Sequence, residues 1–330
     1  MRGLKNSYVS MAGWGLLLAG ALSFASCSSD ETIDGIDMQG KAITFGNVSI
    51  KENSRATDPS YGANDIENFQ VWGTVTGNAN TVNVFNGATV TKGDAAYGVA
   101  WDCDQTQYWI PSATYKFMAI AHGTIASSDS NGMPTAISYT ADGTTDLLLG
   151  EVATNGIKTV TTDVNCTPTE NPVAFTMSHL LSKVHFTFQT TSTGSFNIAD
   201  IEVKGHFASG QYTIAGGSWE SQTVATTALS FGDATGVTST TSQTSADACL
   251  IIPGTQSLSV SFSKTYILNG KEMNTEPVTA SLDDYTFEAN KEYNILVTLE
   301  GGSPITFTIL SLKGWDTDNN GVPQEIDVNL

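Results

Sequence analysis

Apolar side chains alternate with other residues in short stretches along most of the chain after residue 42. Because successive side chains of a β-strand point to opposite faces, this period of two predicts sheets that pack face to face. Clear examples are Tyr115 to Ala121, Val173 to Met177, Val184 to Phe188, Leu258 to Phe262 and Tyr293 to Leu299. Gly301 and Gly302 follow the last example, and residues 305–309 then complete a predicted strand–turn–strand unit.

Few segments depart from this pattern. One helical turn is expected at residues 178–183, where Leu180 and Leu181 would pin it to the core. Residues 190–195 are small and polar, and they mark the expected boundary between two domains. Residues 235–246 predict a long loop inside the second domain.

Composition supports the same fold class. β-Branched and turn-forming residues are abundant, whereas long side chains that favour helices are scarce, so an all-β architecture is expected. The chain has 330 residues and is 40% hydrophobic, enough for two domains with apolar cores. Only 14 basic residues face 33 acidic ones, giving a net charge of −19. Such a chain lacks the clustered cations that bind phosphate backbones, which excludes a nucleic-acid partner.

The first 27 residues have the pattern of an export signal. Arg2 and Lys5 precede an unbroken run of apolar and small residues from Met11 to Ser26. This run is shorter than the roughly 20 residues that span a bilayer, and it predicts a cleaved signal. Residues 24–27 resemble a bacterial lipobox, which implies that Cys27 is acylated with palmitate and anchors the chain to the outer membrane. The alternative is an ordinary secretory signal in which Cys27 is coincidental.

Three cysteines lie after the signal. Cys103, Cys166 and Cys249 form no C-x-x-C pair, so a zinc or thioredoxin-like site has no support. An odd number also argues against a disulfide framework. We expect buried, reduced thiols.

No pattern typical of catalysis is present. The sequence contains no H-E-x-x-H, G-x-S-x-G or P-loop motif, and its four histidines lack ligand spacing. We interpret His179 as structural, because no acidic or nucleophilic residue stands beside it in the sequence. An enzyme is therefore not expected, and neither is a cofactor.

One loop has the spacing of a calcium site. Its ligands would be Asp316, Asp318, Asn320 and Asp327. The last position has Asp in place of the usual Glu, a proline interrupts the loop, and helical flanks are missing. We therefore favour a polar turn and expect no metal.

Several short motifs occur in one order along nearly the whole chain. They are the lipobox, an early Ile-x-Phe strand, an Arg-Ala step, and residues 108–111, 146–149, 173–184, 293–295 and 314–315. Together they resemble the fimbrillin-like lipoproteins, subunits of the type V pili of anaerobic surface-colonising bacteria. The Phe-x-Met-x-His-x-x-x-Lys-Val stretch at 175–184 is the most specific part.

The resemblance implies two tandem transthyretin-like β-sandwich domains, at residues 56–192 and 193–330. Before them would come the signal at 1–27 and a tether with a removable first strand at 28–55. It implies a non-enzymatic subunit or adhesin of a surface-exposed fimbrium, which serves adhesion and whose partners are other pilus subunits. A trypsin-like, arginine-specific protease would remove the first strand, and a neighbour's strand would fill the groove, as in β-augmentation.

Because arginine is rare in this chain, the sequence indicates where an arginine-specific protease would cut it. The chain has two arginines, and Arg2 leaves with the signal, so Arg55 is the single remaining site. Its surroundings are polar and turn-prone, which suits protease access. Cleavage between Arg55 and Ala56 would remove a strand whose phase shifts at Gly46 and Asn47, as at a β-bulge. The apolar side chains of that strand are Ile43, Phe45, Val48 and Ile50. The alternative is that Arg55 is an ordinary surface charge.

The end of the sequence offers a donor strand. Ile326, Val328 and Leu330 alternate up to the last residue and suit three successive pockets of a neighbour. The alternative is that this strand pairs within its own second domain.

A different function also fits the sequence. The alternative is that the chain is a monomeric surface lipoprotein. It would bind glycans or host proteins, with its ligand on a host or a bacterial surface, and would not assemble. Its sugar-stacking candidates are Trp72, Trp101, Trp109 and Trp219, although we expect most of them in the core.

Overall fold

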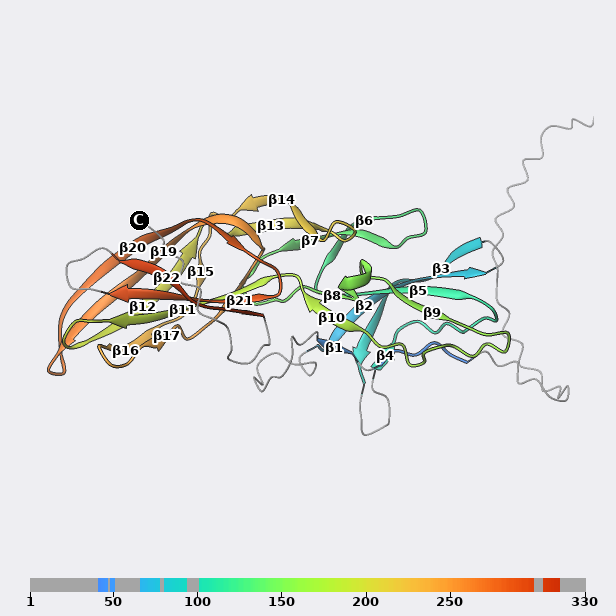
Figure 1. The fold of residues 1–330 in the computed structure, drawn as a ribbon, viewed down its shortest axis with the longest axis horizontal. Helices are drawn as coiled ribbons and strands as arrows, with labels where there is room; N and C mark the ends of the chain where they lie inside the picture. The colour runs from blue at the N-terminus through green and yellow to red at the C-terminus, as the bar shows by residue number, and fades with distance from the viewer. Residues whose placement is uncertain are drawn as a thin grey trace, which may run out of the picture. The chain divides into compact units, whose positions relative to one another are not determined.

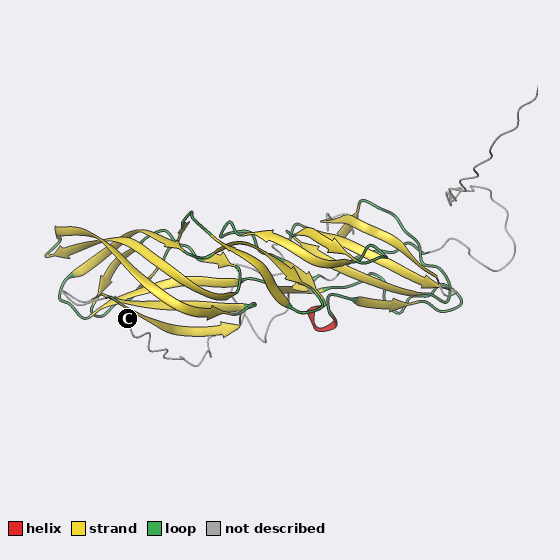
Figure 2. Ribbon diagram, turned by 90° about the horizontal axis from the view of Figure 1, so that it is seen from above, coloured by secondary structure: helices red, strands yellow, loops and turns green. Residues whose placement is uncertain are grey.

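Strands make up the regular structure of the described part of the chain, as the ribbon in Figure 1 shows. The computed structural model describes residues 41–46, 48–50, 66–77, 80–93, 101–299 and 305–314. Their one helical element is the 3₁₀ turn η2, Val152–Thr154, drawn red in Figure 2. The all-β prediction is therefore confirmed. No helix among these residues is long and apolar enough to cross a membrane.

The first core is built on an eight-stranded sheet in the order β1-β10-β8-β5-β2-β3-β4, with β9 also paired to β5. These strands are β1 (Ser49–Ile50), β2 (Asn68–Gly77), β3 (Asn80–Lys92), β4 (Trp101–Cys103), β5 (Thr114–Ala121), β8 (Leu148–Gly150), β9 (Lys158–Thr161) and β10 (Thr176–His179). The alternation predicted at Tyr115 to Ala121 is confirmed in β5. Its odd-numbered residues lie in the first core, whereas Met118 and Ile120 on the opposite face join another apolar cluster.

The second core lies between two five-stranded sheets. One has the order β17-β11-β21-β22 with β18 paired to β11, and the other has the order β15-β12-β19-β20 with β16 paired to β12. Alternate residues of both sheets fill a single apolar cluster, the arrangement of a β-sandwich. The strands are β11 (Ser182–Thr190), β12 (Ser195–Lys204), β15 (Leu229–Ser230), β16 (Ala234–Thr238), β17 (Gln243–Thr244), β18 (Cys249–Ile251), β19 (Gly254–Leu268), β20 (Lys271–Phe287), β21 (Lys291–Leu299) and β22 (Thr306–Gly314).

A four-stranded sheet links the two halves of the sequence. Its order is β14-β13-β7-β6, so β7 from before residue 192 pairs with β13 from after it and joins two strands of each half in one sheet. These strands are β6 (Thr124–Ser128), β7 (Pro134–Thr140), β13 (Phe207–Thr213) and β14 (Ser218–Val224). In addition, β11 precedes the boundary predicted at residues 192 and 193 but packs in the second core. Strand pairing and packing thus run across that boundary.

Two local predictions are wrong. Residues 178–183 form no helical turn: β10 ends at His179 and β11 begins at Ser182. The backbone there is held by sheet partners, since the Leu180 N–H donates to the Leu147 carbonyl at 2.9 Å. Residues 235–246 are not one loop, because they contain most of β16 and all of β17. In contrast, the predicted pairing of the last two strands is confirmed by the β21–β22 ladder.

The three cysteines are free thiols. Cys249 is buried, and this burial raises its pKa to about 12, so the thiol stays protonated at neutral pH. Cys103 and Cys166 are half-buried rather than buried, which corrects part of the expectation.

Candidate functional site: an N-terminal segment in the first core

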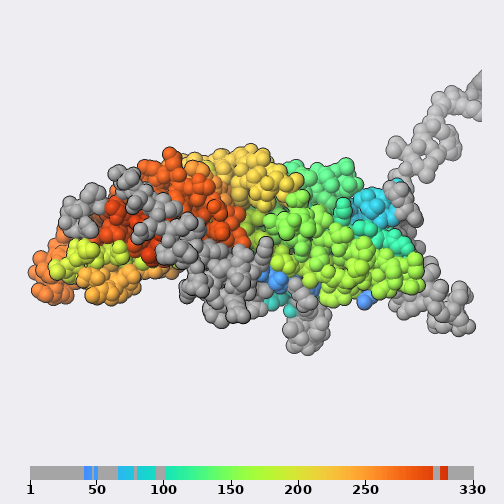
Figure 3. Space-filling view, viewed as in Figure 1, coloured from blue at the N-terminus to red at the C-terminus, as the bar shows by residue number. Residues whose placement is uncertain are grey.

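Residues 41–46 and 48–50, here called the N-terminal segment, lie in the first core. The side chains of Ile43, Phe45, Val48 and Ile50 are only 4%, 3%, 7% and 8% exposed. All four belong to the apolar cluster formed by β2, β3 and β5. On the face shown in Figure 3, the segment is visible only as small blue patches beside the green strands of the first half.

The beginning of the segment pairs with a loop that precedes β5. The Ile43 N–H donates to the Gln107 carbonyl at 2.8 Å, and the Trp109 N–H donates to the Lys41 carbonyl at 3.1 Å. These are antiparallel contacts between parts of the chain more than sixty positions apart. The segment is therefore bound by the domain, much as a separate peptide would be.

The rest of the segment pairs with β10 and the residues just before it. The Val173 N–H donates to the Thr44 carbonyl at 2.8 Å, and the Gly46 N–H donates to the Val173 carbonyl at 2.9 Å. The Ser49 N–H donates to the Phe175 carbonyl at 3.0 Å, where β1 runs parallel to β10. Because β1 ends the strand order of its sheet, removing it would leave β10 at an open edge.

The register of this pairing contains the predicted phase shift. Four positions separate Phe45 from Ser49, but three separate their partners Val173 and Thr176. The extra residue lies on the segment, at or near Gly46, as in a β-bulge. The shift lets the apolar side chains on both sides of it face the same core.

Phe45 is the centre of this packing. Its ring lies 5.4 Å from that of Phe85 and 6.0 Å from that of Phe117, both edge to face, and 6.1 Å from the stacked ring of Phe175. Aromatic pairs in these geometries contribute free energy beyond the area that they bury. Asn171 adds a polar anchor, because its Oδ1 accepts from the Thr44 N–H at 3.1 Å and from the Thr44 hydroxyl at 3.0 Å.

The sequence of this chain is similar to that of a known protein family. A family model described as fimbrillin-like matches residues 54–315 of the chain. The chain belongs to the fimbrillin-like family. The match begins after the N-terminal segment and ends before the predicted donor strand at the end of the sequence.

Solved structures share the fold of this fimbrillin-like chain. A fimbrial protein from Bacteroides vulgatus superposes with a TM-score of 0.60 at 14% identity, covering 83% of this chain and 99% of its own. A proposed cell adhesion protein from Bacteroides ovatus gives a TM-score of 0.51 at 18% identity, covering 85% and 99%. At these identities the likeness shows the fold. No match was found among curated proteins.

Several predicted site residues of the fimbrillin-like chain lie outside the described residues. These are the lipidation site Cys27, the cleavage site Arg55 and Ala56, the donor residues Ile326, Val328 and Leu330, and the calcium candidates Asp316, Asp318, Asn320 and Asp327. Within the described ranges, no group of three side chains is arranged to hold a metal.

The four tryptophans proposed as sugar platforms are not freely exposed. Trp72 and Trp109 are buried. Trp101 packs edge to face on Phe69 at 5.2 Å, and the Trp219 indole N–H donates to the Leu180 carbonyl at 3.0 Å. These contacts give the tryptophans structural roles in the fimbrillin-like fold.

Asp146 is a residue of the fimbrillin-like chain that sequence reasoning missed. Its Oδ2 lies 2.5 Å from Nδ1 of His179, and both side chains are buried. His179 therefore has an acidic partner, although none stands beside it in the sequence. The antiparallel pairing of β8 with β10 places Leu148 opposite His179 and so brings Asp146 within reach. The motif at 146–149 contained this aspartate, but a sequence does not show which strands pair.

Substituting alanine for Asp146 is expected to lower the free energy of unfolding by about 1–3 kcal/mol, because buried His179 loses its carboxylate acceptor. Urea unfolding at neutral pH measures this change. The control is Asp102→Ala, which removes an exposed carboxylate and should stay within about 0.5 kcal/mol of the unsubstituted chain. Equal effects of the two substitutions would contradict a stabilising role for the pair.

Proposed function

We propose that this chain is a structural subunit or adhesin of a cell-surface pilus, activated when a protease removes its N-terminal segment. It reaches the outer membrane as a lipoprotein acylated at Cys27. An arginine-specific, trypsin-like protease cuts between Arg55 and Ala56, and subunits then assemble by donor-strand exchange. Its partners are other pilus subunits of the same or a related type.

Membership of the fimbrillin-like family supports the coarse part of this proposal, a non-enzymatic pilus or adhesion protein of the cell surface. The names of the two solved structures, a fimbrial and a proposed adhesion protein, agree with it.

The proposal of proteolytic activation and donor-strand exchange rests on how the N-terminal segment packs and pairs in the first core. Four of its side chains fill the first core, and the backbone pairs found among the described residues join it to positions far along the sequence. Burying four such side chains contributes roughly 6–12 kcal/mol. Excision would therefore leave an apolar groove beside an unpaired strand edge, and this is the kind of site that an incoming strand completes.

The donor proposed for this groove is the alternating end of a neighbouring copy, with Ile326, Val328 and Leu330 as its apolar side chains. Three such side chains contribute about 4–9 kcal/mol, and association costs about 4–15 kcal/mol. Backbone hydrogen bonds, at about 0.5–1.5 kcal/mol each, must supply the remainder.

Arginine-specific proteolysis of the purified chain tests this proposal. We expect one cut, a new N-terminus at Ala56 in mass spectrometry, and ladders that resist SDS in electrophoresis. The Arg55→Lys variant should remain uncut and monomeric, because it keeps the charge but removes the recognised residue. The matched control is Lys51→Ala, which should be cut and assemble normally. Ladders formed by uncut chain or by Arg55→Lys would overturn the mechanism.

A further inference from the structure

The inward face of the β19–β20 hairpin changes chemistry along its length. Its cross-strand pairs are apolar at first: Leu258 with Leu282, Val260 with Ala280 and Phe262 with Val278. With the same period of two, the next pairs are Lys264 with Glu276 and Tyr266 with Asn274. Side chains that continue a core face normally remain apolar, so this change marks the place where the face stops serving the core.

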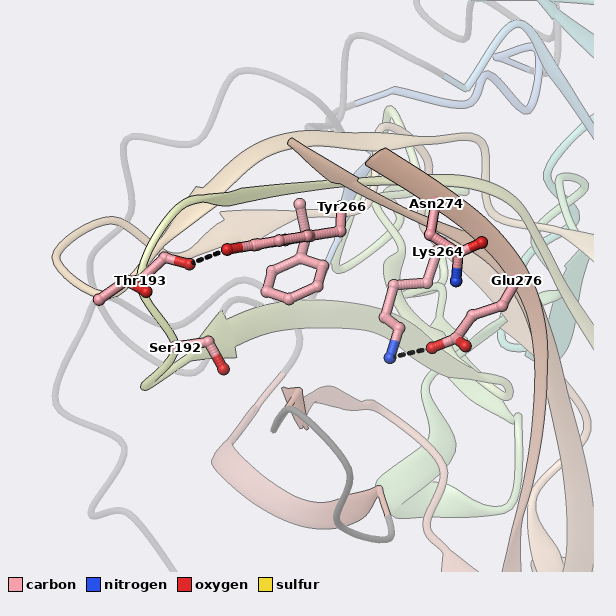
Figure 4. A pocket seen from close by; sticks show the side chains of 7 residues that line it. Ser192, Thr193, Lys264, Tyr266, Asn274 and Glu276 are labelled. Carbon is pink, nitrogen blue, oxygen red and sulfur yellow. Dashed lines mark hydrogen bonds and ion pairs between the residues drawn. The ribbon is translucent and has the colours of Figure 1, made fainter. Parts of the chain in front are cut away.

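A pocket of about 290 Å³ opens at this change. It is lined by Ser192, Thr193, Phe196, Lys264, Tyr266, Asn274 and Glu276, which Figure 4 shows as sticks. Residues 192 and 193 follow β11 of the opposite sheet, whereas the others come from β12, β19 and β20. The pocket therefore lies beside the β11–β12 connection, against the sheet that contains β12, β19 and β20.

Contacts among the lining residues fix their positions. The Tyr266 hydroxyl donates to the Thr193 carbonyl at 2.8 Å, and its ring packs against that of Phe196 at 5.2 Å. Lys264 Nζ lies 2.6 Å from Glu276 Oε1 and 5.7 Å from the centre of the Phe196 ring. These contacts hold an aromatic ring and a row of polar groups along one wall before any ligand arrives, as a binding site requires.

The charge of the site selects its ligand class. Among the described residues that line the pocket, only Lys264 and Glu276 are charged, and they pair with each other. Glu276 repels an anionic ligand and Lys264 repels a cationic one, whereas a neutral ligand with many hydroxyl groups can bond to both partners and to Asn274. An aromatic face beside such groups also suits the C–H face of a sugar ring, whose hydrogens are attracted to the ring's electrons.

We propose that this pocket binds one neutral pyranose ring of a saccharide. Its volume is close to the lower limit of about 300 Å³ for small-molecule sites, so it suits a single sugar ring with the rest of the glycan outside. The ring would lie against Tyr266, and its hydroxyl groups would bond to Glu276, Lys264 and Asn274. This binding is independent of the proposed proteolysis and assembly, because no residue of the N-terminal segment takes part.

Saturation-transfer NMR on the uncut full chain tests the site, with millimolar methyl glycosides of glucose, galactose, mannose, fucose and N-acetylglucosamine as probes. At least one probe should give a signal. Tyr266→Ala should weaken its binding by about tenfold or more, whereas Tyr266→Phe, which keeps the ring, should retain most of it. Glu276→Gln should also weaken binding, and it leaves the apolar packing intact if Tyr266→Ala destabilises the sheet.

Two matched controls come from elsewhere on the surface. Tyr108→Ala removes an exposed aromatic ring and Glu220→Gln an exposed carboxylate, and both should bind the probe as the unsubstituted chain does. Absence of binding by all five probes would overturn the proposal. It would also be overturned if Tyr266→Ala and Glu276→Gln both bound the probe as strongly as the unsubstituted chain does. Stronger binding of methyl glucuronide than of the neutral probes would overturn the assignment to a neutral sugar.

Discussion

Replacing Phe45 with alanine should lower the free energy of unfolding of the uncut chain by about 3–5 kcal/mol. The ring is 3% exposed and contacts the rings of Phe85, Phe117 and Phe175. Its truncation removes apolar surface from the core and leaves a cavity among three aromatic rings that cannot easily collapse into it. Urea unfolding, followed by the intrinsic tryptophan fluorescence to which Trp109 of the same core contributes, measures the loss.

The control is Thr44→Ala, one position earlier in the segment. Thr44 is exposed, and its side chain bonds only to Asn171 among the contacts found, so we expect a loss of about 0.5–1.5 kcal/mol. Equal losses from Phe45→Ala and Thr44→Ala would contradict the central role of the Phe45 ring in holding the segment in the first core.

The strands of this fold were predictable where one face is buried. Leu258 to Phe262 and Tyr293 to Leu299 lie in strands, because a period of two follows from the geometry of a half-buried strand. Tyr115 to Ala121 also lies in a strand, although apolar side chains are buried on both of its faces. The four apolar residues of the N-terminal segment were identified in the same way, and they are buried.

What the sequence did not reveal depends on pairing between distant residues. Local pattern favoured a turn at 178–183, but tertiary pairing extends β10 to His179 and starts β11 at Ser182. The Asp146–His179 contact and the sheet shared between the halves arise from strand order, which periodicity does not contain. Likewise, predicting the pocket beside Tyr266 would require the register of β19 with β20. It would also require knowing that residues 192 and 193 lie next to these two strands.

Cleavage at Arg55 is expected to be needed for assembly, because the uncut chain holds its own N-terminal segment tightly in the groove. While the chain is intact, the segment binds its groove as part of the same molecule, at an effective concentration set by the intervening residues. An incoming donor with three apolar side chains then competes against a tethered segment with four. After a cut at Arg55 this advantage is lost, since the segment becomes a separate peptide that dissociates and must return from solution.

A synthetic peptide of residues 41–50 should therefore inhibit assembly of the cut subunit. Added in excess after proteolysis, it should reoccupy the groove through the backbone hydrogen bonds described above and four buried side chains, and so abolish the SDS-resistant ladders. The matched control is the same peptide with Phe45→Asp, which would bury a charge among three aromatic rings and should leave the ladders unchanged.

A peptide of residues 325–330 separates the groove from its occupant. If the end of a neighbouring copy is the donor, this peptide should also suppress the ladders, and deletion of these residues should prevent assembly without changing the cut at Arg55. Inhibition by the 41–50 peptide alone would retain the groove but exclude this donor. Failure of both peptides to inhibit assembly, with binding of the 41–50 peptide to the cut subunit verified by fluorescence anisotropy, would show that subunits join elsewhere on the molecule.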